Sequence, residues 1–190
     1  AGHKWGMETS TTITVPNGTQ NGDLLILIFN IYGSKIPDRP AGWSTLASGI
    51  NKKDPRFVHS QAIFYRKLTG AISNFSVSHS PNFSSWILLR IPDGDIPIAS
   101  SVATGRNWYP DPPALTHNFA KGTDVLWIAV TGWTNDYDNS VTKWPEGFDD
   151  NRIAEVGIHY TNTAISTHST TENPQDPGYY VIFGISDPIY

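Results

Sequence analysis

The 190-residue chain contains no cysteine, which excludes disulfide bonds, thiolate metal sites and cysteine nucleophiles. The GxxxxGK[ST] and GxGxxG patterns that bind nucleotide phosphates are also missing, and we expect no cofactor. The longest apolar run, residues 24–32, has nine residues and is interrupted by Asn30. Because a membrane-spanning helix needs about 20 apolar residues, we expect no insertion into a membrane.

Charged residues are scarce, at 16% of the chain, and the formal net charge is −4. Binding to phosphates needs a basic stripe, so this balance argues against nucleic acid as a partner. Residues 1–100 contain nine Lys and Arg against six Asp and Glu (+3), whereas residues 101–190 contain four against eleven (−7). Such polarity sets the register of neighbouring subunits, although a chance collection of charges in loops explains it equally well.

What the sequence does have is glycine, proline and aromatic residues: 16 Gly, 14 Pro and 12% aromatics. This mixture is typical of strands and turns and predicts an all-β chain. Short apolar stretches between Gly, Pro and Asn residues predict the strands. The expected strands are residues 11–15, 24–32, 42–47, 61–67, 74–79, 86–91, 115–119, 124–132, 155–160, 163–168 and 179–185.

Four patterns occur twice in the same order, offset by 101, 105, 95 and 94 positions. Such self-similarity indicates a duplicated β unit. The pairs are Asp23 to Ile28 with Asp124 to Ala129, Pro40 to Trp43 with Pro145 to Phe148, Ala62 to Tyr65 with Gly157 to Tyr160, and Trp86 to Ile91 with Tyr180 to Ile185.

The strand spacing and the repeat predict one domain over residues 1–190, a two-sheet β-sandwich of jelly-roll type with about ten strands. Its repeated units are expected at about 11–98 and 113–190, linked through 99–112. Several strands are continuously apolar and do not alternate, so both of their faces should be covered. Loops or a neighbouring subunit explain this pattern, and we expect a homo-oligomer, with a trimer as the first assumption.

The six histidines show no metal-ligand spacing such as HExxH, and we expect no metal site. His79, His117, His159 and His168 fall on or near expected strands, whereas His3 and His59 are expected to be exposed. The sequence has no Gly-x-Ser-x-Gly nucleophile elbow, and Ser84 and Ser85 lie in turn-like sequence. We therefore nominate no catalytic triad and no catalytic residue.

A glycan hydrolase needs two carboxylates that face each other across a cleft. The chain offers Asp136, Asp138, Glu146, Asp149, Asp150 and Glu155 within 20 residues, but turn propensity explains acids in loops more simply. The run Asn135 to Asn139 has oxygen ligands that suit Ca²⁺, yet it lacks the glycine and the terminal glutamate of an EF-hand loop.

Aromatic residues mixed with acids and amides mark the candidate binding site. A flat ring provides an apolar platform for pyranose C–H groups, while carboxylates and amides bond to the hydroxyls. The alternative is that these rings close the ends of a sandwich core or contact another subunit. The candidate ligand-binding residues are Asn107, Trp108, Tyr109, Trp133, Asp136, Tyr137, Asp138, Asn139 and Trp144.

Gly22-Asp23 before an apolar strand, Pro40 to Trp43, Ala62 to Thr69 and Trp86 to Ile91 form a pattern over nearly the whole chain. It resembles a family of β-sandwich domains found in bacteriophage virions, often in tail fibres. The second half matches more loosely, since Phe148 replaces the tryptophan and Gly178-Tyr179-Tyr180 stands in place of Ser84-Ser85-Trp86. These motifs are structural and bring no catalytic residues.

The resemblance implies a virion-surface component in a tail fibre, a baseplate or a capsid decoration. Our leading hypothesis is therefore a non-enzymatic structural or adhesion module that contacts other virion subunits or the host surface, with recognition by loops 104–112 and 133–150. A carbohydrate-binding module for host glycans is the first alternative, and a glycan hydrolase that uses acids between Asp136 and Glu155 is the second.

Overall fold

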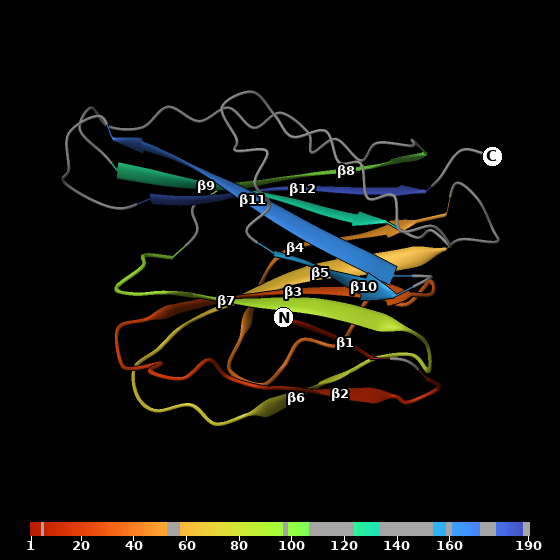
Figure 1. The fold of residues 1–190 in the computed structure, drawn as a ribbon, viewed down its shortest axis with the longest axis horizontal. Helices are drawn as coiled ribbons and strands as arrows, with labels where there is room; N and C mark the ends of the chain where they lie inside the picture. Colours follow the sequence, from red (N-terminus) through yellow and green to blue (C-terminus); the bar gives the residue numbers. More distant parts are fainter. Residues whose placement is uncertain are drawn as a thin grey trace.

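The computed structural model describes residues 1–4, 6–52, 58–96, 99–106, 124–133, 154–158, 161–171 and 178–187. Within these residues the chain is all-β, as predicted, with twelve strands and no helix. The strands form two five-stranded sheets and one two-stranded sheet. The sheets are stacked as three layers (Figure 1), and the middle layer is the sheet that contains β3 (Leu24–Tyr32).

The middle layer, called here the first sheet, is antiparallel throughout in the order β1-β7-β3-β5-β4. Strand β3 lies at its centre and corresponds to the predicted apolar run 24–32. Strand β4 contains a bulge between Thr45 and Ala47, where its register to β5 shifts. The remaining strands are β1 (Gly2–Lys4), β4 (Ser44–Asn51), β5 (His59–Lys67) and β7 (Ser84–Ile91).

The second sheet has the order β10-β11-β9-β12-β8. Its pairs β10–β11 and β11–β9 are antiparallel, whereas β12 runs parallel to both of its neighbours, β9 and β8. The carboxyl ends of β8, β9 and β12 therefore lie at one edge of this sheet. The strands are β8 (Ala99–Arg106), β9 (Asp124–Trp133), β10 (Ala154–Ile158), β11 (Thr161–Thr171) and β12 (Gly178–Asp187).

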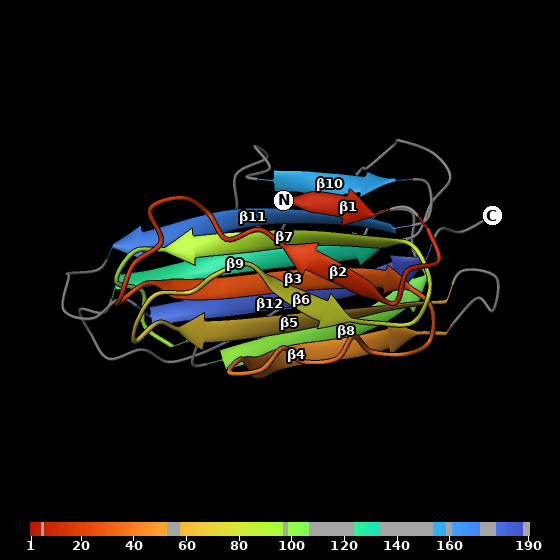
Figure 2. The ribbon, with the colours of Figure 1, turned by 90° about the horizontal axis from the view of Figure 1, so that it is seen from below.

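The small sheet pairs β2 (Ser10–Ile13) with β6 (Phe75–Ser78) in antiparallel register. Figure 2 shows it crossing obliquely over the face of the first sheet that points away from the second sheet. Ile13 and Val77 are fully buried there, in one cluster with Leu25, Leu27 and Phe29 of β3. The small sheet is thus a lid over one face of β3.

The two large sheets share one strand order. In the first sheet the strands in chain order are β1, β3, β4, β5 and β7, and in the second they are β8, β9, β10, β11 and β12. Both sheets place them as first, fifth, second, fourth, third. They differ in direction at one place, because the fifth strand is antiparallel to the second in the first sheet (β7 to β3) and parallel to it in the second sheet (β12 to β9).

This order corrects one of the four sequence matches. Residues 157–160 were paired with Ala62 to Tyr65 of β5, but Gly157 and Ile158 belong to the edge strand β10. The strand that occupies the place of β5 is β11, which pairs with β9 as β5 pairs with β3. Short apolar patterns resemble one another, so the sequence match could not distinguish two neighbouring strands of a hairpin.

All ten strands that were predicted within the described part are present, with ends shifted by a few residues. Two strands were missed. Strand β1 has only three residues, and β8 occupies most of the segment 99–112 that was assigned to a link. Strand β8 is rich in Ser and Thr and lacks the apolar pattern by which the others were recognised. The predicted strand 115–119 lies outside the described residues.

Strand β3 is buried on both faces, as its continuous apolar run predicted. Leu24, Ile26 and Ile28 point toward the second sheet, where they form one cluster with Ile128, Val130 and Ile165. The alternate residues point toward the small sheet, as the two-residue period of a strand requires. Each such buried side chain contributes about 1.5–3 kcal/mol. The chain's own sheets cover both faces, so the apolar pattern requires no neighbouring subunit.

The core between the two large sheets becomes polar at one end. Ser85, Asn30 and Gln61 lie side by side on β7, β3 and β5, opposite Thr163 and Gly132 of the second sheet. The hydroxyls of Ser85 and Thr163 are 2.9 Å apart and form a buried hydrogen bond between the sheets. A Cβ atom on Gly132 would come within 2.6 Å of Gln61 Nε2. We call these five residues the polar rung.

Gln61 is the weak member of the polar rung. Its side chain is fully buried, and neither amide atom has a hydrogen-bond partner in the part of the chain that the structure describes. A buried polar group without a partner costs about 1–3 kcal/mol. The glutamine therefore contributes less to stability than an apolar side chain of its size would.

We predict opposite effects for two substitutions in the polar rung. Gln61→Leu should leave the free energy of unfolding unchanged or raise it by about 1 kcal/mol, because it removes unpartnered groups. Ser85→Ala should lower it by about 1–2 kcal/mol, because the Thr163 hydroxyl loses its partner across the sheets. Urea denaturation measures both values. A larger loss for Gln61→Leu than for Ser85→Ala would contradict this description of the rung.

Candidate functional site

Trp133 is the one candidate binding residue whose backbone the structure describes, and it is the last residue of β9. In the parallel ladders it pairs with Ser186 of β12, and the next residue, Asp187, pairs with Arg106 at the end of β8. Asn162 of β11 pairs with Trp133 on its other side. The other eight candidates, Asn107, Trp108, Tyr109, Asp136, Tyr137, Asp138, Asn139 and Trp144, lie outside the described residues.

The two candidate loops are nevertheless attached at one place. The chain leaves β8 after Arg106 and leaves β9 after Trp133, and one strand, β12, separates these two ends. Because neighbouring strands are about 4.8 Å apart, the two exits are separated by roughly 10 Å. Segments 107–123 and 134–153 therefore both begin at the carboxyl edge of the second sheet, above the polar rung.

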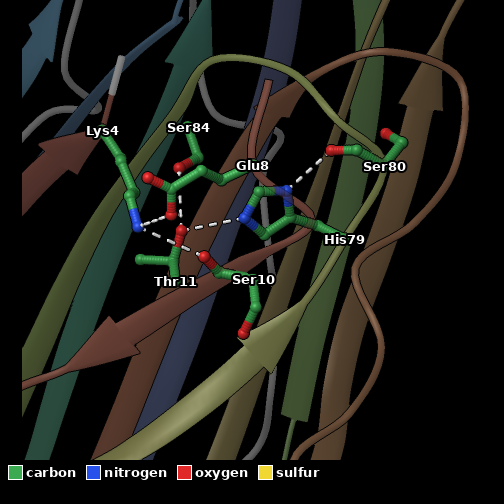
Figure 3. Close-up of polar contacts among 7 residues, drawn as sticks. All are labelled: Lys4, Glu8, Ser10, Thr11, His79, Ser80 and Ser84. Carbon is green, nitrogen blue, oxygen red and sulfur yellow. Dashed lines mark hydrogen bonds and ion pairs between the residues drawn. The ribbon is translucent and has the colours of Figure 1, made fainter. Parts of the chain in front are cut away.

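Among the described residues, the side chains closest to a catalytic arrangement are Thr11, His79 and Ser80 (Figure 3). The Thr11 hydroxyl lies 2.8 Å from His79 Nε2, and His79 Nδ1 lies 2.7 Å from the Ser80 carbonyl oxygen. A hydroxyl, an imidazole base and an acceptor that orients the base are the parts of a nucleophilic site. Sequence reasoning missed this group because Thr11 on β2 is 68 positions away from His79, which follows β6.

Burial argues against catalysis at this group. Thr11 is 1% exposed and His79 is 5% exposed, so a substrate cannot bring its reacting atom to the hydroxyl. The Thr11 hydroxyl also lies 3.4 Å from the Ser84 hydroxyl on β7. The group thus ties the small sheet to the first sheet, and its chemistry is that of a structural hydrogen-bond network.

Two expectations about single residues were wrong. His59 was expected to be exposed and is fully buried at the start of β5. Ser84 and Ser85 were placed in turn-like sequence, but they begin β7 and are fully buried. Polar residues at strand ends look like turn residues in a sequence, whereas here Ser85 faces the second sheet and Ser84 faces the small sheet. His3 is exposed, as expected.

The metal and carboxylate candidates are mostly untested. His117, His159, the run Asn135 to Asn139, and all but one of the hydrolase acids lie outside the described residues. Glu155 lies on β10, where its backbone pairs with Ala164, and the backbone of His168 on β11 pairs with Trp127. Across the described residues no three His, Asp or Glu side chains are grouped so that they could hold a metal ion.

The Gly-Asp motif before β3 forms an ion pair. The Asp23 carboxylate is fully buried, and its Oδ2 accepts hydrogen bonds from Arg90 Nε at 2.6 Å and from the Gln20 backbone N–H at 2.8 Å. The hydrogen bond from Arg90, followed by that from Gln20, lowers the pKa of Asp23 below its ordinary 3.8. In the second half Asp124 takes the place of Asp23, while the position matched to Arg90 is Gly184.

The Pro-x-Gly-Trp motif is a turn that delivers a tryptophan to the core. The Trp43 N–H donates to the Pro40 carbonyl at 3.2 Å, and Gly42 between them has φ +78°, which an L side chain rarely adopts. The Trp43 ring is 3% exposed and lies 4.8 Å from the Phe75 ring on β6. The motif therefore helps to fix the small sheet on the first sheet.

We predict that the contribution of the Asp23–Arg90 pair depends on pH. The folded-state pKa of Asp23 is lowered, so the stabilisation is complete above about pH 4 and is lost as the pH falls through the folded-state pKa. Asp23→Asn should destabilise the protein at pH 7, and the difference from the unaltered protein should shrink toward pH 2. Denaturant titrations across this range measure the difference.

Asp38→Asn is the matched control. Asp38 pairs with Lys35 at 3.5 Å, and both side chains are more than half exposed, so this pair contributes only a few tenths of a kcal/mol. An equal loss for Asp23→Asn and Asp38→Asn at pH 7 would show that the buried pair has no special part in the fold.

Comparison with known proteins gives no relative. No protein-family model matches the chain, and neither a curated protein nor a solved structure matches it significantly. In the described ranges no helix is long and apolar enough to cross a bilayer. No match bears on the resemblance to virion β-sandwich domains, which stays a prediction from the motif residues.

Proposed function

We propose that the protein is a non-enzymatic structural or adhesion module of a bacteriophage particle, in a tail fibre, a baseplate or a capsid decoration. The observation that carries this proposal is the common edge of the second sheet, from which segments 107–123 and 134–153 both leave. Loops that leave a β scaffold at one edge often bind partners, because the scaffold fixes the positions from which they start. The geometry supports a binding module, and the motif resemblance is the reason for proposing that this module belongs to a virion.

The architecture that we propose is one β-sandwich domain of jelly-roll type over residues 1–190, made of two related units. The shared strand order of the two large sheets supports the duplication, and the cluster that joins Ile28 and Ile63 to Val130 supports a common core. The parallel pairing of β12 departs from the antiparallel pattern of a jelly roll. The proposed duplication therefore includes a reversal of the last strand in one unit.

The proposed partners are other virion subunits, and the proposed location is the particle surface. The difference in charge between the two halves, +3 in residues 1–100 and −7 in residues 101–190, supports an ordered assembly. A homo-oligomer, with a trimer as the first assumption, stays a prediction. It no longer draws support from β3, since the chain's own sheets bury both faces of that strand.

A carbohydrate-binding module is the alternative. The segment after Arg106 contains Trp108 and Tyr109, and the segment after Trp133 contains Asp136 and Tyr137. The common edge at which β8 and β9 end, next to these two segments in the sequence, supports the alternative. Host-surface glycans are the class of ligand that such a site on a phage particle would bind.

We predict that the edge carries the binding activity. Trp133→Ala and Trp108→Ala should each abolish attachment of the purified protein to host cells or to a glycan array, because each removes an aromatic platform. Ile96→Ala is the matched control: Ile96 is 49% exposed and follows Gly94, which lies against Leu24 and Ile91 at the opposite end of the first sheet. It should bind like the unaltered protein.

The outcomes separate the alternatives. If the protein attaches to particles but gives no signal on a glycan array, the result supports the structural module. If it gives a specific glycan signal that both tryptophan variants lose, the result supports the carbohydrate-binding module. Turnover of host polysaccharide that Asp136→Ala abolishes would replace both with the hydrolase. Absence from purified particles, as judged by immunogold labelling, would contradict the virion assignment.

A further inference from the structure

His79 lies where the N-terminal part of the chain meets the first sheet. It follows β6 directly, and its backbone N–H donates to the Thr9 carbonyl at 2.9 Å, which extends the β2–β6 pairing by one residue. Its ring centre lies 5.5 Å from that of Phe29 on β3, and the Phe29 ring stacks on Trp86 of β7 at 6.2 Å. Gly2 of β1 lies against the same Trp86 ring.

The hydrogen bonds of His79 are complete with the neutral ring. The Ser80 carbonyl oxygen can only accept, so Nδ1, at 2.7 Å, carries a hydrogen. In the neutral ring Nε2 has no hydrogen and accepts the hydrogen bond from the Thr11 hydroxyl at 2.8 Å. The Thr11 oxygen is left to accept from the Ser84 hydroxyl at 3.4 Å. One neutral imidazole thus orients a chain of hydroxyls that runs from β2 to β7.

The charged groups that act on this ring come from the N-terminal segment. Lys4 on β1 forms an ion pair with Glu8, and its Nζ lies 3.4 Å from the Ser10 carbonyl oxygen. Figure 3 shows the pair beside Thr11 and Ser84. Of the described side chains, those in contact with the ring from β2 and β3, Thr11 and Phe29, carry no charge. Among the described residues, Glu8 is the anion that acts on the ring, and Lys4 pairs with it. Asp38, whose backbone N–H donates to the Ser78 carbonyl next to His79, pairs with Lys35.

We propose that His79 is a pH-operated lock that holds β2 and the N-terminal segment on the first sheet. When Nε2 takes a proton from solvent, it becomes a donor and can no longer accept from Thr11, so the hydroxyl chain must reverse or break. The resulting cation lies next to the Phe29 ring and on the same side as Lys4, and His79 is only 5% exposed. A charge that is buried away from water costs free energy. Opening the N-terminal segment brings water to the imidazolium and removes this cost.

The direction of the pH response follows from the environment of the ring. Burial, as the largest cause, lowers the pKa of His79 below its ordinary 6.5; Lys4 lowers it further, while the Ser80 carbonyl and Glu8 oppose the shift. The closed form therefore binds a proton less readily than the open form. The lock is fully closed above pH 6.5 and weakens as the pH falls below that value toward the pKa of the closed form.

Hydrogen exchange of the full chain tests the lock. After correction for intrinsic rates, protection of the amides in residues 10–13 should fall by up to about tenfold per pH unit below 6.5. His79→Gln cannot take up the proton, so its protection should not change with pH over this range. His3→Gln, which alters an exposed histidine on β1, should behave like the unaltered protein. Equal pH dependence in the unaltered protein and in His79→Gln would overturn the proposal.

Two further variants keep the proposal testable if His79→Gln does not fold. Lys4→Gln removes the cation that opposes protonation of the closed form, so it should raise the pKa of His79 and reduce the loss of protection below pH 6.5. Glu8→Gln removes the anion that favours protonation, so it should lower that pKa and increase the loss. The His79 ring signals in an NMR titration report the two shifts in pKa directly. Shifts in the same direction for both variants, or titration of His79 near 6.5 without loss of protection, would refute the lock.

Discussion

The fold depends on the burial of one strand, β3, from both sides. Its even-numbered residues Leu24, Ile26 and Ile28 pack against the second sheet, and its odd-numbered residues pack against the small sheet. A strand with two buried faces must lie between two other layers, so the three-layer arrangement follows from this one sequence segment. The motif residues then fix the neighbours of β3. Asp23, directly before the strand, pairs with Arg90 of β7. The Trp43 ring packs against the Phe75 ring of the small sheet.

Polar groups decide how the layers are aligned along β3. At the Asn30 end the facing sheets meet through Ser85 and Thr163, whereas the neighbouring positions, Ile28 and Val130, are apolar. A slip of the sheets would place hydroxyl and amide groups against isoleucine side chains, which costs several kcal/mol. On the opposite face of the first sheet, Thr11 and His79 act in the same way for the small sheet. The apolar residues thus supply most of the stability, and a few buried polar residues supply the alignment.

The sequence predicted the fold better than the site, for physical reasons. The apolar run 24–32 and the turn residues around it predicted β3 and its two covered faces, because strand periodicity is a local property. Strand β8 was missed because Ala99 to Arg106 is rich in Ser and Thr and forms a strand only through its parallel pairing with β12. The network of Thr11, His79 and Ser84 was missed because it joins residues 68 and 73 positions apart. The interruption at Asn30 was the one local sign of the polar rung.

The two large sheets face each other with Ser85 opposite Thr163. The chain has no cysteine, so the double variant Ser85→Cys/Thr163→Cys can form one intramolecular disulfide and no other. We expect it to form on mild oxidation of the native protein and to be found by mass spectrometry of a non-reduced digest, because the two hydroxyl oxygens are 2.9 Å apart. Ser84→Cys/Thr163→Cys, whose first cysteine points to the other face of β7, should stay reduced. Failure of the first pair to cross-link, or equal cross-linking of both pairs, would contradict the account.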